Sequence, residues 1–133
     1  MIDELTLQQV VARIVAEAQP SRVILFGSYG RGDASPGSDL DIMVVKPHVP
    51  NRYEEMIRLR KAVGSIGTGI DLLVYSEAEY ERRSQVPGTV LYWARKEGRP
   101  RYAATWVTDV RRWAEEQVRA AGKSKQAPGA DKV

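Results

Sequence analysis

Three short apolar runs do most to constrain how this chain folds. They span residues 22–26, 40–45 and 70–75. Glycine, proline or serine follows each run within two residues, which is typical of buried strands. Around the runs, apolar residues recur at helical spacing. The predicted helices cover residues 5–18, 52–63, about 76–83, 89–97 and 105–121. Strands that alternate with helices indicate a layered α/β (α+β) domain.

Several helix ends carry recognisable signals. Thr6 with Gln9, and Ser76 with Glu79, match the capping-box pattern in which a hydroxyl and an acid or amide satisfy two free amides. Gly64 suits a helix C-terminus. These signals support the predicted boundaries of three helices.

The C-terminal part differs in composition from the rest. We predict a domain over residues 1–104, an amphipathic helix over 105–121, and a disordered basic tail over 122–133, which consists largely of Lys, Gly, Ala and Pro. The apolar stripe of the helix includes Trp106 and Trp113. The sequence leaves open whether this stripe packs on the core or forms a docking face.

Composition narrows the class of protein. The length of 133 residues predicts a single domain. Because the sequence has no cysteine, it excludes disulfides and thiolate metal sites, which is consistent with the cytoplasm. We expect no signal peptide, and because no uncharged run reaches membrane-spanning length, we also expect no membrane association. The net charge of the chain is +3, and its basic surplus lies in residues 99–133, which contain eight basic and four acidic residues. Either a solvated helix and tail or an acidic partner explains this surplus, and without a nucleic-acid module we do not expect nucleic acid binding.

Asp39 and Asp41 flank Leu40 at the start of the second apolar run. On a strand they point the same way, roughly 6.6 Å apart along the chain. Two carboxylates on one side repel each other unless a cation lies between them. Hard oxygen ligands suit Mg²⁺ or Mn²⁺, and Mg²⁺ usually completes its shell with water and phosphate. The pair therefore predicts a metal site that serves a phosphate-bearing ligand.

Asp71 supplies a third carboxylate at the start of the third run. If that strand lies beside the second, Asp71 reaches the same site. Three carboxylates can hold two ions roughly 3.5–4 Å apart. Asp71 would then also orient or deprotonate an attacking hydroxyl.

Gly27 and Ser28 stand where the first run ends. Glycine permits a positive φ and close backbone approach, and amides exposed at such a turn attract phosphate. The Ser28 hydroxyl adds a donor, and Arg31 in the same loop offers a cation for phosphate. The loop carries neither a Walker motif nor a dinucleotide-binding glycine pattern.

The stretch GSYGRGDASPGSDLDIMVV, with Asp71 beyond it, resembles the minimal nucleotidyltransferase (MNT) family of the DNA polymerase β superfamily. The resemblance covers about residues 5–102 and implies a small mixed sheet of three to four strands flanked by helices. It implies transfer of AMP, or another NMP, from ATP or another NTP with two Mg²⁺ ions (Mn²⁺ is an alternative). By this resemblance the metal ligands and catalytic residues are Asp39, Asp41 and Asp71. The nucleotide-binding residues are Gly27, Ser28, Arg31 and Ser38.

Members of that family often pair with HEPN-type toxins, so the resemblance implies an antitoxin that modifies a tyrosine of such a partner. Two other functions remain open: transfer to a small acceptor such as an aminoglycoside, and neutralisation of a toxin by binding alone. Structural interpretations also remain for single residues. As alternatives to a role in the metal site, Asp39 would end the turn of residues 36–38, Asp41 would be a surface strand residue, and Asp71 would be a turn residue after Gly69. As alternatives to phosphate binding, Ser28 would cap a helix and Arg31 would form a surface ion pair.

Overall fold

The computed structural model describes residues 1–130, with side chains through residue 120. Six α-helices, four strands and one 3₁₀ helix follow one another in these residues. In chain order they are α1 (Glu4–Ala18), β1 (Arg22–Phe26), α2 (Gly27–Arg31), β2 (Leu40–Lys46), α3 (Arg52–Val63), β3 (Ile70–Ser76), α4 (Glu77–Arg83), α5 (Val90–Glu97), β4 (Arg99–Ala103), η1 (Ala104–Trp106) and α6 (Val110–Ala130). The predicted α/β class is confirmed.

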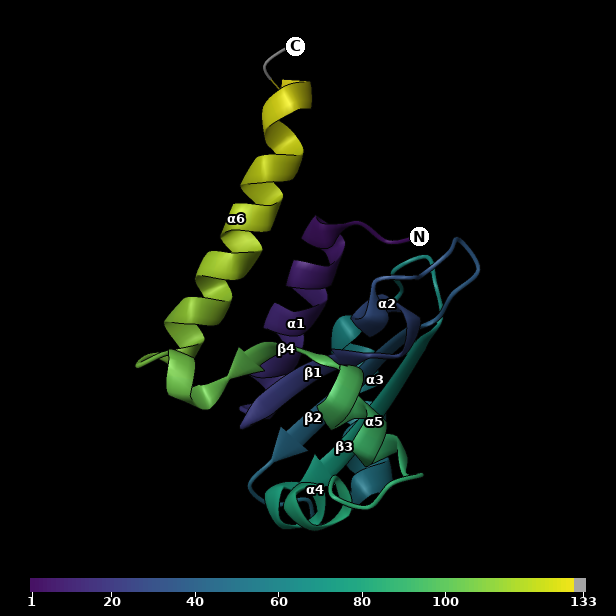
Figure 1. Cartoon of the computed structure of the whole chain (residues 1–133). Coiled ribbons are helices and arrows are strands. Elements are labelled where there is room, and N and C mark those ends of the chain that lie inside the picture. The colour runs from purple at the N-terminus through teal and green to yellow at the C-terminus, as the bar shows by residue number, and fades with distance from the viewer. Residues whose placement is uncertain (131–133) are drawn as a thin grey trace.

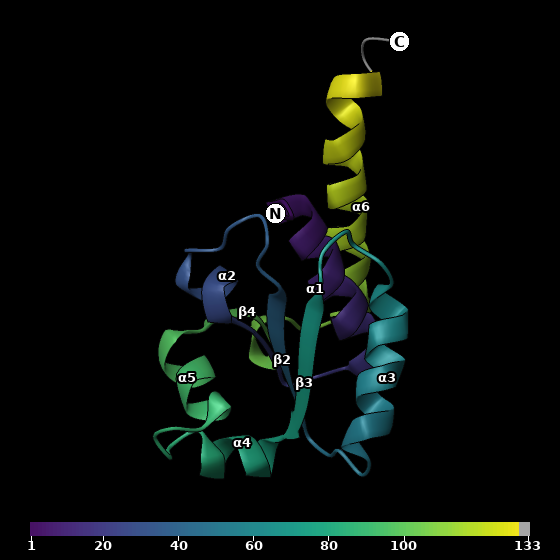
Figure 2. The same cartoon turned by 90° about the vertical axis from the view of Figure 1, so that its right-hand side faces the viewer.

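One mixed sheet organises the molecule. Its strand order is β3-β2-β1-β4, with β2 and β3 parallel and the other neighbours antiparallel. Helices α1 and α3 cover one face, whereas α4 and α5 lie on the other (Figures 1 and 2). The short helix α2 follows β1 directly, at the end of the sheet where β2 and β3 begin (Figure 2).

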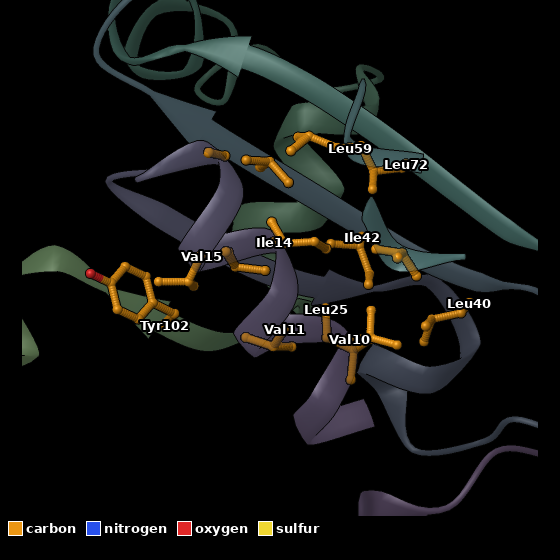
Figure 3. Close-up of a cluster of buried hydrophobic side chains, with 14 of the residues drawn as sticks. Val10, Val11, Ile14, Val15, Leu25, Leu40, Ile42, Leu59, Leu72 and Tyr102 are labelled. Atoms are coloured by element: carbon orange, nitrogen blue, oxygen red, sulfur yellow. The ribbon is translucent and has the colours of Figure 1, made fainter. Parts of the chain in front are cut away.

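Period-two alternation divides the strand side chains between two cores. Leu40, Ile42 and Val44 join the larger cluster beneath α1 and α3 (Figure 3). Met43 and Val45 join the smaller cluster beneath α4 and α5. All five are almost fully buried, and a buried side chain of this size contributes about 1.5–3 kcal/mol. The same alternation decides which face each site residue can occupy.

Two helix starts differ in how well they were predicted. Ser76 accepts a hydrogen bond from the Glu79 amide, as the capping pattern predicts. The cap of α1 was wrongly placed at Thr6: Asp3 caps the helix and accepts from the Thr6 amide at 2.7 Å. An aspartate carboxylate caps a helix as well as a hydroxyl does, and its negative charge also interacts favourably with the positive end of the helix dipole.

The C-terminal end of α3 agrees with the prediction. Gly64 adopts φ +73° there, and its amide donates a hydrogen bond to the Arg60 carbonyl.

The C-terminal segment departs from prediction at both ends. Helix α6 begins at Val110 rather than at residue 105, because Asp109 accepts a hydrogen bond from the Arg112 amide and caps it there. Trp106 lies instead on η1, with 58% of its surface exposed. The structure continues α6 through residue 130, whereas the sequence predicts a disordered tail over 122–133. Residues 131–133 of that tail lie outside the described part.

The first turns of α6 pack on the core. Trp113 lies against Tyr102 with ring centroids 4.9 Å apart, and Val110 also packs against the larger cluster. The rest of α6 extends away from the sheet (Figure 1). Among the described residues, none of the helices combines the length and apolarity needed to cross a bilayer.

Candidate active site

The three predicted acids come from the end of the sheet where β2 and β3 begin. Asp41 and Asp71 are register partners in the parallel pair, and Asp39 precedes β2 by one residue. Asp41 and Asp71 alternate with residues of the α1–α3 core, so they face the side of α4 and α5. The condition set by the sequence, that the third strand lies beside the second, is met.

Two glycines leave the space that these carboxylates occupy. A Cβ added to Gly27 would lie 2.0 Å from Oδ2 of Asp41, and one added to Gly69 would lie 2.4 Å from Oδ1 of Asp39. Gly27 also has φ +64°, a conformation that side chains disfavour. Both carboxylates are therefore packed against backbone that carries no side chain.

The electrostatics show that the acids interact. Burial raises the pKa of the Asp41 carboxyl, and the charges of Asp71 and then Asp39 raise it further, while Arg31 acts in the opposite direction. Asp39 and Asp71 are exposed, and Asp41 is half-buried. The site thus gathers negative charge at a solvent-accessible edge.

These donors suit a hard divalent cation. In the described part of the chain, no group of three or more His, Cys, Asp or Glu side chains is placed so that all could hold one metal ion. Mg²⁺ commonly takes only one or two carboxylates and fills its other positions with water and phosphate oxygen. The oxygen donors and the glycine-lined space fit that mode of binding, which leaves room for a phosphate-bearing ligand.

The turn after β1 places the other predicted residues. Within the described residues no hydrogen bond engages the Ser28 hydroxyl, and Phe26 rather than Ser28 occupies the cap position of α2. Arg31 forms surface ion pairs with Asp33 at 3.2 Å and Glu97 at 4.0 Å. The structure therefore excludes capping by Ser28 and contains the surface pairs expected as an alternative for Arg31.

Ser38 has a clear local role. Its hydroxyl accepts a hydrogen bond from the Ser35 amide at 3.0 Å, and its carbonyl accepts one from the Thr68 hydroxyl at 3.1 Å. These bonds close the turn before Asp39 and tie it to the loop before β3. Whether Ser38 also binds nucleotide stays a prediction.

The family profile described as the nucleotidyltransferase domain matches residues 7–117, which is most of the chain. The chain belongs to the nucleotidyltransferase domain family. It is accordingly an enzyme of the transferase class.

Several solved structures are similar to this chain. A candidate nucleotidyltransferase from Sulfolobus solfataricus is 20% identical, covering 78% of this chain and 92% of its own, with a TM-score of 0.50. A toxin–antitoxin crystallised with AMP-PNP is 19% identical over 95% of this chain and 97% of its own, with a TM-score of 0.49. A mutant of the toxin–antitoxin MntA-HpeT is 18% identical over the same shares, also with a TM-score of 0.49. No curated protein is significantly similar in sequence. At these identities the first likeness shows the nucleotidyltransferase fold and nothing finer.

One feature of this nucleotidyltransferase was missed by sequence reasoning. A hollow of about 440 Å³ opens beside Gly27, lined also by Phe26, Arg31, Trp93 and Glu97. Trp93 and Glu97 lie one helical turn apart on α5, and both are exposed. Their i, i+4 spacing was the available signal, but it does not say which element the pair faces. A larger hollow of about 770 Å³ lies between α1 and α6, and none of its lining residues belongs to the predicted site.

Proposed function

We propose that this nucleotidyltransferase moves AMP from ATP onto a hydroxyl of a partner protein, a tyrosine of a cognate HEPN-type toxin, and acts as the antitoxin of the pair. The observation that carries the catalytic part is the parallel register of Asp41 with Asp71, with Asp39 beside them and glycine-lined space around the carboxylates. The choice of donor and acceptor rests on the resemblance of residues 27–45 to the MNT family.

Five of the seven predicted site residues have a direct role in this reaction. Asp39, Asp41 and Asp71 would hold Mg²⁺, which when bound neutralises the carboxylates and the triphosphate and polarises the α-phosphate. The tyrosine oxygen attacks the α-phosphorus, the bond to pyrophosphate breaks, and the tyrosine proton passes to Asp71 and then to solvent. Ser28 and Arg31 bind the triphosphate.

Arg31 can change partners at little cost. Its ion pairs with Asp33 and Glu97 involve side chains that are all more than 40% exposed. Exposed pairs of this kind contribute about 0–1 kcal/mol, whereas a guanidinium–phosphate contact is charge-assisted and commonly bidentate. Binding of the triphosphate would therefore draw Arg31 away from its carboxylate partners.

The domain division is part of the proposal. Residues 1–104 hold all seven predicted site residues, so we take them as the catalytic unit. Helix α6 packs by its first turns and extends beyond that unit (Figure 1). Its extended part would be available to the toxin.

The test uses ATP labelled on the α-phosphate, Mg²⁺ and the purified partner protein. Label should move onto the partner, with pyrophosphate released. Asp41→Asn and Asp71→Asn should each lower the rate at least roughly a hundredfold, since each removes a charge that the reaction uses. Glu54→Gln is the control, because Glu54 is an exposed acid on α3 without an ion pair in the described residues.

Three outcomes would contradict the proposal or part of it. Undiminished transfer by Asp41→Asn would exclude the assigned site. Full neutralisation of the toxin by Asp41→Asn, without any label on the toxin, would show that the chain acts by binding alone. Label on an aminoglycoside but not on the protein partner would make a small molecule the acceptor.

A further inference from the structure

The hollow beside Gly27 has no role in the proposed transfer so far. We infer that it holds the base of the nucleotide, with the Trp93 indole as a stacking surface and the Glu97 carboxylate as an acceptor for amino groups on the edge of the base. This inference rests on the proposed function, since it gives a place to the nucleoside whose triphosphate lies at α2 and the carboxylates.

The position of the hollow fits a nucleoside. Gly27 lines it, and the same glycine lies against the Asp41 carboxylate. Arg31 lines it too, and its charge acts on Asp41. A ligand with its phosphates at the carboxylates would therefore extend directly into this space. Its volume of about 440 Å³ lies within the range of roughly 300–1,000 Å³ common for small-molecule sites.

Trp93 is not needed for the core. On α5 the residues that pack on the sheet are Leu91 and Ala94, both almost fully buried, whereas 47% of Trp93 is exposed. Tyr92 contacts the indole edge to face, with centroids 5.3 Å apart and an interplanar angle of 84°. With this contact made, nearly half of the Trp93 surface still faces solvent. An exposed indole beside a phosphate site is suited to stacking on a base.

Glu97 should make the hollow prefer adenine to uracil. It stands one turn beyond Trp93, and an ionised carboxylate accepts hydrogen bonds but does not donate them. Adenine offers an amino group to such an acceptor, whereas uracil flanks its single ring N–H with carbonyl oxygens that the carboxylate repels. When Arg31 moves to phosphate, its 4.0 Å ion pair with Glu97 breaks, and the Glu97 carboxylate becomes available to the base. The site should therefore prefer ATP to UTP.

The experiment compares two ligands by isothermal titration calorimetry on the full chain with Mg²⁺: ATP, and inorganic tripolyphosphate, which has no base. Trp93→Ala should weaken ATP binding roughly tenfold and leave the tripolyphosphate Kd unchanged. Trp93→Phe should keep most of the affinity, because it retains an aromatic face. Trp106→Ala is the matched control, since Trp106 is also exposed but lies outside the hollow. Glu97→Gln should reduce the preference for ATP over UTP.

The outcomes separate this inference from the proposal beneath it. If the wild-type chain binds neither ATP nor tripolyphosphate, the proposed function fails and the base site fails with it. If it binds both and Trp93→Ala changes neither Kd, only the base site is wrong. A Trp93→Ala variant with normal ATP affinity but slower labelling of the partner would assign the hollow to the acceptor, and would also overturn the inference.

Discussion

Replacing Gly27 with alanine should disable the site and also weaken the fold. The new methyl group would meet Oδ2 of Asp41 at 2.0 Å and its Cγ at 2.9 Å, so the carboxylate must turn away. The φ of +64° adds a cost of about 1–2 kcal/mol for a residue with a side chain. For a chain of this size, that loss lowers the melting temperature by about 4 °C per kcal/mol.

Three other glycines separate the two effects. Gly64 has φ +73° and ψ −163° but open space around it, so Gly64→Ala should lose about 1–3 kcal/mol of stability and keep transfer activity. Gly69 lies outside the left-handed region, but its Cβ would meet Asp39 at 2.4 Å, so Gly69→Ala should keep stability and lose activity. Gly37 has neither constraint, and Gly37→Ala should be neutral or slightly stabilising, by up to about 1 kcal/mol.

The assays are thermal unfolding and transfer of labelled AMP, run on all four variants. A misplacement of about 1 Å at a reacting group can cost roughly a hundredfold in rate, so Gly27→Ala and Gly69→Ala should each lose at least about tenfold. Equal activity in Gly64→Ala and Gly69→Ala would refute the reasoning. It would mean that contact with the carboxylates does not govern the reaction.

Two predictions concern stability and pH. Burial and the charge of Asp71 raise the pKa of Asp41, so in metal-free buffer its charge destabilises the fold above the raised pKa. Asp41→Asn should raise the free energy of unfolding at pH 7, and urea titrations should show this gain shrinking toward pH 4; a gain that grows in acid would contradict the assignment. The second prediction concerns Glu55, whose pKa is lowered by hydrogen bonds from Arg58. The ionised Glu55 carboxylate therefore stabilises the fold at neutral pH, and this stabilisation is lost as the carboxylate is protonated in acid. Glu55→Gln should cost about 1 kcal/mol at pH 7 by the same titration, whereas Glu54→Gln, an exposed control without an ion pair in the described residues, should cost nothing measurable.

The central strands were predictable because their own residues specify them. The central strands β1 and β2 are buried on both faces along most of their length, so nearly every position is Val, Ile, Leu, Met or Phe. The sequence also places Asp39 and Asp41 on one side by alternation alone. The register of Asp41 with Asp71 is different, because it depends on how α3 carries the chain across the sheet. Spacing along the chain does not determine that crossover.

β4 shows where local pattern fails. The segment Arg99–Ala103 contains Pro100 and two arginines, and only Tyr102 is fully buried. Proline is tolerated there because β4 lies at the edge of the sheet, where it pairs with β1 across an irregular register. Its strand conformation comes from that partner rather than from its own propensity. The hollow lined by Trp93 was equally out of reach, since packing of α5 beside α2 and β1 creates it.

The surroundings of the acids support the catalytic role proposed for them over a purely structural one. A surface strand residue at position 41 would be solvated and free of nearby acids, and its pKa would stay ordinary. Asp41 is instead half-buried, near two other carboxylates, and against a glycine at φ +64°. The first two features work against stability in the absence of a cation, since burial of charge and repulsion between carboxylates both favour the unfolded chain. A divalent cation with a triphosphate relieves the repulsion, so the local destabilisation is itself an argument that this edge of the sheet exists to bind them.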